Sequence, residues 1–220
     1  MKNKIAPSMM CADAMRLGET LTVFEKCGIE YLHIDIMDGV FVPNLTLGTD
    51  YCKMLKRNTS IPLDIHLMIT EPESKLSWFE FGKGDYVSVH AEATDNLSDA
   101  LKVIRSRGAR PMVAISPDTP VSLIEDVLSL VDGVLVMTVN PGFAGQKMIP
   151  ATLGKITELR GMLDEKGYGE VEIEVDGNVS FENALRMRDA GANIFVGGTS
   201  SVFYSGGTLE ENIARMRESL

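Results

Sequence analysis

The sequence predicts an α/β fold, a (β/α)8 TIM barrel that forms one domain over residues 1–220. Short apolar runs alternate with longer helical patterns from one end of the chain to the other, which is typical of repeated βα units around a parallel sheet. No linker or low-complexity segment interrupts this alternation. A chain of 220 residues with 45% hydrophobic residues is long enough for a small barrel with one packed core.

Eight apolar runs are the expected strands, at residues 5–8, 31–36, 63–67, 86–89, 112–115, 133–137, 170–175 and 194–196. Amphipathic segments predict the helices, at residues 13–26, 49–56, 73–81, 97–106, 121–130, 151–165, 181–189 and 209–219. Gly28, Gly84, Gly108 and Gly191 precede strands, at points where a helix ends and positive φ is favoured.

Two of these strands carry metal-binding side chains at alternate positions. His33 and Asp35 share one face of the second strand, and Asp64 and His66 share one face of the third. A lone strand histidine is usually structural, but here two of the three histidines occupy matching places beside an acid. Asp176 ends the seventh strand, so all these groups lie at or near the end of a barrel where catalytic groups gather. Imidazole and carboxylate ligands together predict a site for a divalent metal ion.

Further residues are expected around this end of the barrel. His90 ends the fourth strand and either supports the site or is structural. Met37, Met68 and Met137 lie near strand ends, where they either cap the reacting centre or fill the core. Glu174, and Glu172 below it, either support the metal ligands or form an ion-pair layer inside the barrel.

Three glycine-containing loops follow the last three strands, at residues 137–146, 176–178 and 197–201. In barrels, the loops after the seventh and eighth strands commonly bind a phosphate through backbone N–H groups. A metal ion beside such a site can acidify a carbon that lies between a carbonyl and a hydroxyl group. Two carboxylates on opposite sides of that carbon, Asp35 and Asp176, could then exchange its proton and invert it.

Composition limits the possible partners and location. The net charge of −10 argues against a nucleic-acid partner, because phosphates would be repelled. Cys11, Cys27 and Cys52 are odd in number and form no close pair, so we expect reduced thiols rather than a disulfide framework. The sequence has no apolar signal core and no long apolar span, which predicts a cytoplasmic protein without a membrane partner.

These residues together resemble the ribulose-phosphate 3-epimerase family. The motifs that carry the resemblance extend over essentially the whole chain and lie at residues 6–8, 33–44, 64–68, 137–146 and 174–177. The resemblance implies a barrel of the ribulose-phosphate-binding type and one divalent metal ion, which could be Zn, Mn, Fe, Co or Mg. It implies that the metal ligands are His33, Asp35, His66 and Asp176. Asp35 would accept the proton and Asp176 would donate it, with the roles exchanged in reverse turnover.

The resemblance also implies a set of substrate contacts. Ser8 and His66 would contact the sugar, and the methionines would cap it. The phosphate would bind to the glycine-containing loops. The full set of expected contacts is Ser8, Met37, His66, Met68, Met137, Gly142, Phe143, Ala144, Gly145, Gly177, Gly198, Thr199 and Ser200.

Loop details divide two branches of this family. Thr138, Ala144 and the Thr199-Ser200 pair resemble the branch that acts on allulose 6-phosphate, whereas Asn140 does not. On this basis we expect C3 epimerisation of allulose 6-phosphate to fructose 6-phosphate, and the alternative is ribulose 5-phosphate to xylulose 5-phosphate. The other possibilities are a sugar-phosphate lyase and a non-catalytic sugar-phosphate-binding barrel. A Schiff-base lyase requires a lysine at a strand end, whereas the lysines of this chain fall mostly in helices and loops. A homo-oligomer is also expected.

Overall fold

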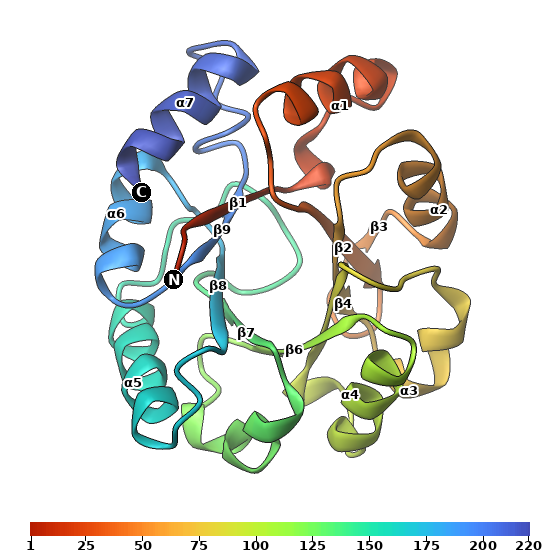
Figure 1. Ribbon diagram of the computed structural model, residues 1–220, viewed down its shortest axis with the longest axis vertical. Coiled ribbons are helices and arrows are strands. Elements are labelled where there is room, and N and C mark those ends of the chain that lie inside the picture. The colour runs from red at the N-terminus through yellow and green to blue at the C-terminus, as the bar shows by residue number, and fades with distance from the viewer.

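Eight parallel strands form the wall of a barrel in the computed structural model, which describes residues 1–220 (Figure 1). They are β1 (Lys4–Pro7), β2 (Leu32–Asp38), β4 (Leu63–Met68), β5 (Tyr86–His90), β6 (Arg110–Ile115), β7 (Gly133–Met137), β8 (Glu172–Asp176) and β9 (Ile194–Gly197). Each expected strand is present, with ends that differ by no more than two residues from the predicted ones. The sequence prediction of a TIM barrel is therefore confirmed.

The barrel closes between its second and first strands. Neighbouring strands are hydrogen-bonded in the order β1, β9, β8, β7, β6, β5, β4 and β2. A parallel bridge between Ser8 and His33 then joins the chain just after β1 to β2. The two-residue strand β3 (Leu45–Thr46) pairs antiparallel with the end of β2. The closure thus places Ser8 beside a predicted metal ligand.

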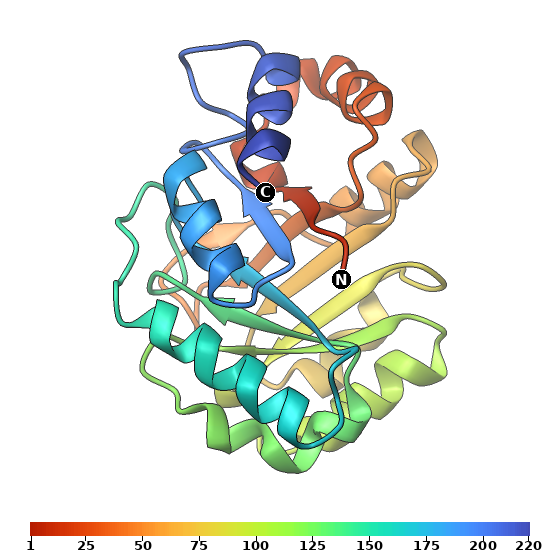
Figure 2. The same cartoon turned by 60° about the vertical axis from the view of Figure 1, so that its left-hand side comes forward.

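Helices surround the barrel wall (Figures 1 and 2). The α-helices are α1 (Leu17–Lys26), α2 (Thr49–Asn58), α3 (Pro72–Lys75), α4 (Leu97–Ser106), α5 (Thr152–Glu165), α6 (Phe181–Asp189) and α7 (Leu209–Ser219). The 3-10 segments are η1 (Met9–Cys11), η2 (Ala14–Arg16), η3 (Leu76–Trp78), η4 (Ala91–Ala93) and η5 (Val121–Leu130). None of the helices is long and apolar enough to cross a bilayer.

Two helical predictions were wrong in detail. The helix expected at residues 73–81 stops early, because Phe79 turns to extended backbone and packs its ring into the core. The segment η5 is a 3-10 helix rather than the expected α-helix. It still buries Val121, Ile124 and Leu128, and a spacing of three and four residues serves either helix type.

Alternation along the strands divides the buried side chains into two layers. Leu32, Ile34 and Ile36 belong to the large apolar cluster that also contains the helix residues Leu55 and Leu101. The intervening residues of the same strand point to the other side, into the barrel. A separate apolar cluster fills the barrel interior and consists of Ala6, Tyr31, Tyr86, Met112, Ala114, Leu135, Met137 and Ile194.

An ionic group closes the barrel near the start of the strands. The carboxylate of Glu172 forms an ion pair with the Lys4 ammonium group and accepts a hydrogen bond from the Tyr86 hydroxyl. Arg110 lies 3.4 Å from the same carboxylate, and Asn193 Nδ2 donates a hydrogen bond to it at 3.1 Å. Glu172 is thus part of an ion-pair layer, one of the two roles expected for it. Both chain ends lie close together, where Asn3 donates to the Leu220 carbonyl oxygen at 2.6 Å. The opposite end of the barrel is left free for the functional site.

Candidate active site

Four polar side chains converge at the carboxyl end of the barrel. His33 and Asp35 come from β2, His66 comes from β4, and Asp176 is the last residue of β8. In the β2–β4 register Asp35 lies opposite His66, so these two side chains are neighbours inside the barrel. One ligand atom from each of the four residues falls within 4.8 Å of all the others.

The distances within this cluster fit a small divalent ion. Nε2 of His33 lies 3.3 Å from Asp35 Oδ1 and 3.9 Å from Asp176 Oδ2. Nδ1 of His66 lies 3.5 Å and 3.9 Å from the same two oxygens. Donors placed about 2.0–2.2 Å from a tetrahedral ion are about 3.3–3.6 Å from one another. The two distances to Asp35 fall within this range, and the two distances of 3.9 Å to Asp176 are slightly longer, so the four atoms lie near the corners of one coordination polyhedron.

The hydrogen bonding of the two histidines supports the same conclusion. His33 Nε2 and His66 Nδ1 are buried and have no hydrogen-bond partner. The other nitrogen of each ring is engaged, since His33 Nδ1 meets Asp64 Oδ2 at 2.5 Å and His66 Nε2 meets His90 Nε2 at 2.8 Å. Buried polar atoms are rarely left unpaired. His33 Nε2 and His66 Nδ1 both face the centre of the cluster. Histidines that bind a metal ion through one ring nitrogen usually donate a hydrogen bond from the other, which is the arrangement found here.

The two carboxyl groups of the cluster have pKa values shifted in opposite directions. Burial and the nearby charge of Asp35 raise the pKa of Asp176 to about 7. Burial also opposes ionisation of Asp35, but the charges and hydrogen bonds of His33 and His66 hold its pKa below the ordinary range. Two carboxyl groups with opposite shifts are the usual sign of an acid and a base in one site.

A deeper carboxyl group lies beneath His33. Glu174 Oε1 is 3.4 Å from His33 Nδ1, and neither Glu174 oxygen has a hydrogen-bond partner. Burial and the charge of Asp64 raise the pKa of Glu174 well above its ordinary value. Glu174 thus lies beside His33 in the barrel interior, next to the four-residue cluster, which is the supporting place expected for it.

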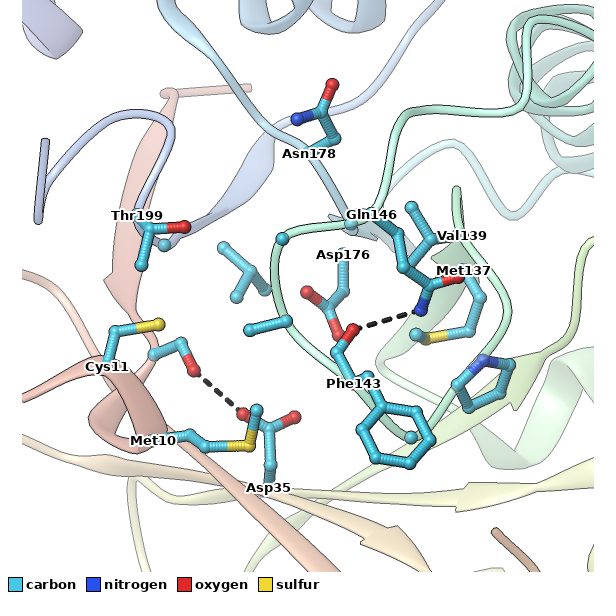
Figure 3. Close-up of a pocket in the computed structure, with 18 of the residues that line it drawn as sticks. Met10, Cys11, Asp35, Met137, Val139, Phe143, Gln146, Asp176, Asn178 and Thr199 are labelled. Atoms are coloured by element: carbon cyan, nitrogen blue, oxygen red, sulfur yellow. Dashed lines mark hydrogen bonds between the residues drawn. The ribbon is translucent and has the colours of Figure 1, made fainter. Parts of the chain in front are cut away.

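A pocket opens above this cluster (Figure 3). Figure 3 shows Asp35 and Asp176 reaching the same central space from different sides, with Phe143 in front and Thr199 and Cys11 to one side. Every predicted substrate contact except His66 lines this pocket. The set is Ser8, Met37, Met68, Met137, Gly142, Phe143, Ala144, Gly145, Gly177, Gly198, Thr199 and Ser200. His33 and His66 are fully buried beneath its floor.

The comparison with known proteins then decides the family. A model of the ribulose-phosphate 3 epimerase family matches residues 4–203.

The chain belongs to the ribulose-phosphate 3-epimerase family.

It is therefore an isomerase that epimerises a sugar phosphate. A ribulose-phosphate 3-epimerase of Bacillus subtilis is 44% identical over 216 residues, covering 98% of this chain and 99% of the relative. A chloroplastic ribulose-5-phosphate-3-epimerase of Arabidopsis thaliana is 45% identical over 201 residues, covering 90% of this chain and 71% of the relative. A solved 3-keto-L-gulonate-6-phosphate decarboxylase from Vibrio cholerae, 15% identical, has the same fold, with a TM-score of 0.70 over 100% of this chain and 97% of its own.

These relatives do not support the predicted allulose 6-phosphate branch. The curated relatives at 36–45% identity carry the ribulose-phosphate name. The structure explains why one of the loop differences is a weak guide. The hydroxyl of Thr138 is buried and donates to the carbonyl oxygens of Asp176 and Gly177 at 2.9 and 2.5 Å. Thr138 thus ties two loops together and does not line the pocket.

Backbone geometry shapes the loop side of this pocket. Gly177 follows β8 with φ of +119°, and a Cβ there would lie 2.6 Å from Val139 Cγ2. The loop after β7 is held over the pocket because Asn44 Nδ2 donates to the Gly142 carbonyl oxygen at 2.8 Å. Within that loop, Gln146 Nε2 donates to the carbonyl oxygens of Asn140 and Phe143 at 2.6 and 2.9 Å.

Sequence reasoning missed part of the pocket wall. The additional lining residues are Met10, Cys11, Val139, Asn140, Pro141, Gln146, Asn178, Val179 and Val196. Met10 and Cys11 directly follow β1 in η1, at the same end of the barrel as Ser8. The rule that strand-end loops build barrel sites applies to the first strand as well, and would have included them.

Metal affinity in this site should fall as the pH is lowered. His33 Nε2 can bind an ion only when deprotonated. Burial disfavours the imidazolium, yet the charges of Asp64 and Asp35 raise the pKa of His33 well above its ordinary value. Binding must therefore displace a proton, and each pH unit below that pKa should weaken binding about tenfold. Competition with a chelator between about pH 6 and pH 8 measures this, and a constant affinity would contradict it.

Proposed function

We propose that this chain interconverts ribulose 5-phosphate and xylulose 5-phosphate by exchanging the proton at C3 between Asp35 and Asp176, with a divalent cation held by His33, Asp35, His66 and Asp176. The observation that carries the proposal is the pair of carboxyl groups, Asp35 and Asp176, that line one pocket and each place one oxygen within 3.9 Å of His33 and His66. Both face one pocket that lies directly above the two unpaired histidine nitrogens. A binding protein would need no such pair.

Each carboxyl group has one oxygen for the cation and one for the proton. Asp35 Oδ1 faces His33 and His66, while Oδ2 accepts a hydrogen bond from Ser8 Oγ at 2.8 Å. Asp176 Oδ2 faces the same two histidines. This leaves Asp35 Oδ2 to remove a proton from one face of C3 and Asp176 Oδ1 to deliver one to the other face. Ser8 orients the base and stabilises its ionised form.

The cation supplies positive charge that stabilises the oxygen anion that develops when the C3 proton leaves. Asp35 becomes protonated in that step, and Asp176 becomes ionised when it delivers its own proton. Reverse turnover begins from this second protonation state with the roles exchanged. The two groups titrate as a coupled pair, because the charge of one changes the pKa of the other.

Three methionines make the rest of the reacting centre apolar. Met37, Met68 and Met137 line the pocket and are nearly fully buried. Met37 and Met68 also pack with Val42 in one small cluster, against which Phe41 and Met10 rest. These side chains offer no proton donor, so they limit exchange of C3 to the two carboxyl groups and exclude water.

The phosphate would bind where the loops after β7, β8 and β9 meet, on backbone N–H groups rather than basic side chains. No lysine or arginine lines this pocket, so the positive potential for a phosphate would come from backbone N–H groups.

An added carboxylate at Gly198 tests this phosphate site. A Cβ there would meet only Cys11 Sγ, at 3.7 Å, so a side chain can be accommodated. Gly198→Asp should raise KM for the sugar phosphate at least about tenfold, because like charges a few ångströms apart in a protein repel by 1–4 kcal/mol. Gly198→Asn has the same shape without the charge and is the matched control. An equal KM for both variants would place the phosphate elsewhere.

The choice of substrate is tested by direct competition. The names of the relatives support ribulose 5-phosphate, whereas Ala144 and Thr199, which do line the pocket, keep allulose 6-phosphate as the second candidate. Values of kcat/KM for the two ketose phosphates should favour ribulose 5-phosphate. A higher value for allulose 6-phosphate would reverse the assignment but leave the two-carboxylate mechanism intact.

Three broader expectations belong to the same proposal. One domain over residues 1–220 implies a single cooperative unfolding transition. A homo-oligomer and a cytoplasmic location stay predictions, and sedimentation velocity and cell fractionation test them.

A further inference from the structure

A third histidine lies directly behind the ligand His66. His90, the last residue of β5, places its Nε2 2.8 Å from His66 Nε2, and both side chains are fully buried. The ring centroids are 5.0 Å apart and the ring planes differ by 27°. These values fit two nearly coplanar rings that meet edge to edge through one hydrogen bond. Phe41 covers the His90 ring at a centroid distance of 4.8 Å.

A fixed carboxylate holds the other side of His90. Nδ1 of His90 lies 3.0 Å from Glu92 Oε2. The second oxygen of Glu92 accepts from the backbone N–H of Ser116 at 2.7 Å and from the Thr119 hydroxyl. Lys155 in turn donates to the carbonyl oxygens of Ser116 and Thr119 at 2.8 and 2.6 Å, which secures that loop.

The positions of the hydrogens in this chain follow from its geometry. The carboxylate of Glu92 only accepts, so Nδ1 of His90 carries a hydrogen. Only one hydrogen can lie between the two facing Nε2 atoms. If His90 is neutral, its Nε2 is the acceptor and His66 Nε2–H is the donor. His66 then has its lone pair on Nδ1, the atom that faces Asp35 and Asp176 and has no hydrogen-bond partner.

We propose that His90 and Glu92 are positioning residues that fix His66 in the tautomer and orientation needed to bind the catalytic cation through Nδ1. This inference rests on the proposed metal site. The other ligand histidine, His33, obtains the same support directly from Asp64 at 2.5 Å. For His66 the carboxylate is that of Glu92 in η4 (Ala91–Ala93), and it does not contact His66 directly. The ring of His90 lies between them and hydrogen-bonds to both.

Nitrogen-15 NMR of the zinc-loaded protein reads the tautomers directly. The experiment correlates the ring nitrogens of each histidine with the hydrogens on its ring carbons. The chain has only three histidines, so the signals can be assigned with single variants. The proposal predicts a hydrogen on Nε2 and none on Nδ1 of His66, and a hydrogen on Nδ1 of His90. A hydrogen on Nε2 of His90, or a zinc ion bound to Nε2 of His66, would overturn it.

Metal affinity gives the second readout. His90→Leu and Glu92→Ala should each weaken zinc or cobalt binding 10–100-fold, the usual loss when the partner of a ligand histidine is removed. Because the two residues act in series, the double variant should bind little more weakly than His90→Leu alone. His90→Gln, which keeps one acceptor and one donor, should recover much of the affinity. The visible spectrum of bound cobalt should change in the variants that lose affinity.

Two controls separate the possible failures. Ser88 lies two residues before His90 on the same face of β5, and its buried hydroxyl has no partner. Ser88→Ala should therefore leave metal affinity unchanged. If the His90 and Glu92 variants bind metal as tightly as Ser88→Ala does, the proposed positioning of His66 by these two residues is refuted. If His66→Ala binds metal as tightly as the unaltered protein, the proposed metal site itself is wrong.

Discussion

Asparagine in place of Asp176 should lower kcat for epimerisation about 10²–10⁴-fold, the usual effect of removing one acid/base group. The amide cannot deliver a proton to C3, while its size and its oxygen ligand are nearly kept. Asp35→Asn should have an effect of the same order, because the second carboxyl group is needed in each direction. Metal content must be measured in the same samples, since both residues are proposed ligands.

The fate of the C3 hydrogen in these two variants distinguishes their roles. In deuterated water, Asp176→Asn should still exchange the C3 hydrogen of the substrate whose proton Asp35 removes, without forming the epimer. Asp35→Asn should show the converse, exchanging only the other epimer. Near-normal epimerisation by a fully metal-loaded Asp176→Asn variant would contradict the two-carboxylate mechanism.

Removal of the metal ion should abolish nearly all activity. Lewis-acid stabilisation of the developing charge contributes several kcal/mol, which corresponds to about 10³-fold or more in rate. His33 Nε2 and His66 Nδ1 have no protein partner to replace the ion. Dialysis against a chelator, followed by an activity assay and metal analysis, measures the loss.

Return of the ion is the control for that experiment. Activity should recover with the stoichiometric addition of one divalent ion per chain, and the ion that restores most activity identifies the preferred metal. Metal binding should also raise the thermal midpoint, because the ion binds the folded protein alone. The His66→Ala variant should show neither recovery nor stabilisation. Full activity of the chelated protein would refute a catalytic metal.

The fold and the centre of the site follow from simple sequence patterns. Alternation in a strand puts His33 and Asp35 on one face, and the rule for parallel barrels brings His66 and Asp176 to the same end. These arguments need only local spacing and the known direction of the strands. For that reason the predicted ligand cluster is found in the structure within 4.8 Å.

Details that depend on three-dimensional contact could not be predicted in this way. Thr138 differs from the usual family loop, but its hydroxyl binds backbone rather than facing the pocket. The link from His66 through His90 to Glu92 joins β4, β5 and η4, and it depends on side-chain directions that no spacing rule gives. The 3-10 geometry of η5 was missed because its buried positions fit an α-helix equally well.

The most direct test of the central claim is proton NMR of the metal-loaded protein in deuterated water with ribulose 5-phosphate. The account predicts that deuterium enters C3 and that xylulose 5-phosphate forms, with both processes lost in the doubly substituted Asp35→Asn, Asp176→Asn protein. Epimer formation with the original hydrogen retained at C3, or no exchange at all with metal bound, would contradict proton transfer through these two carboxyl groups.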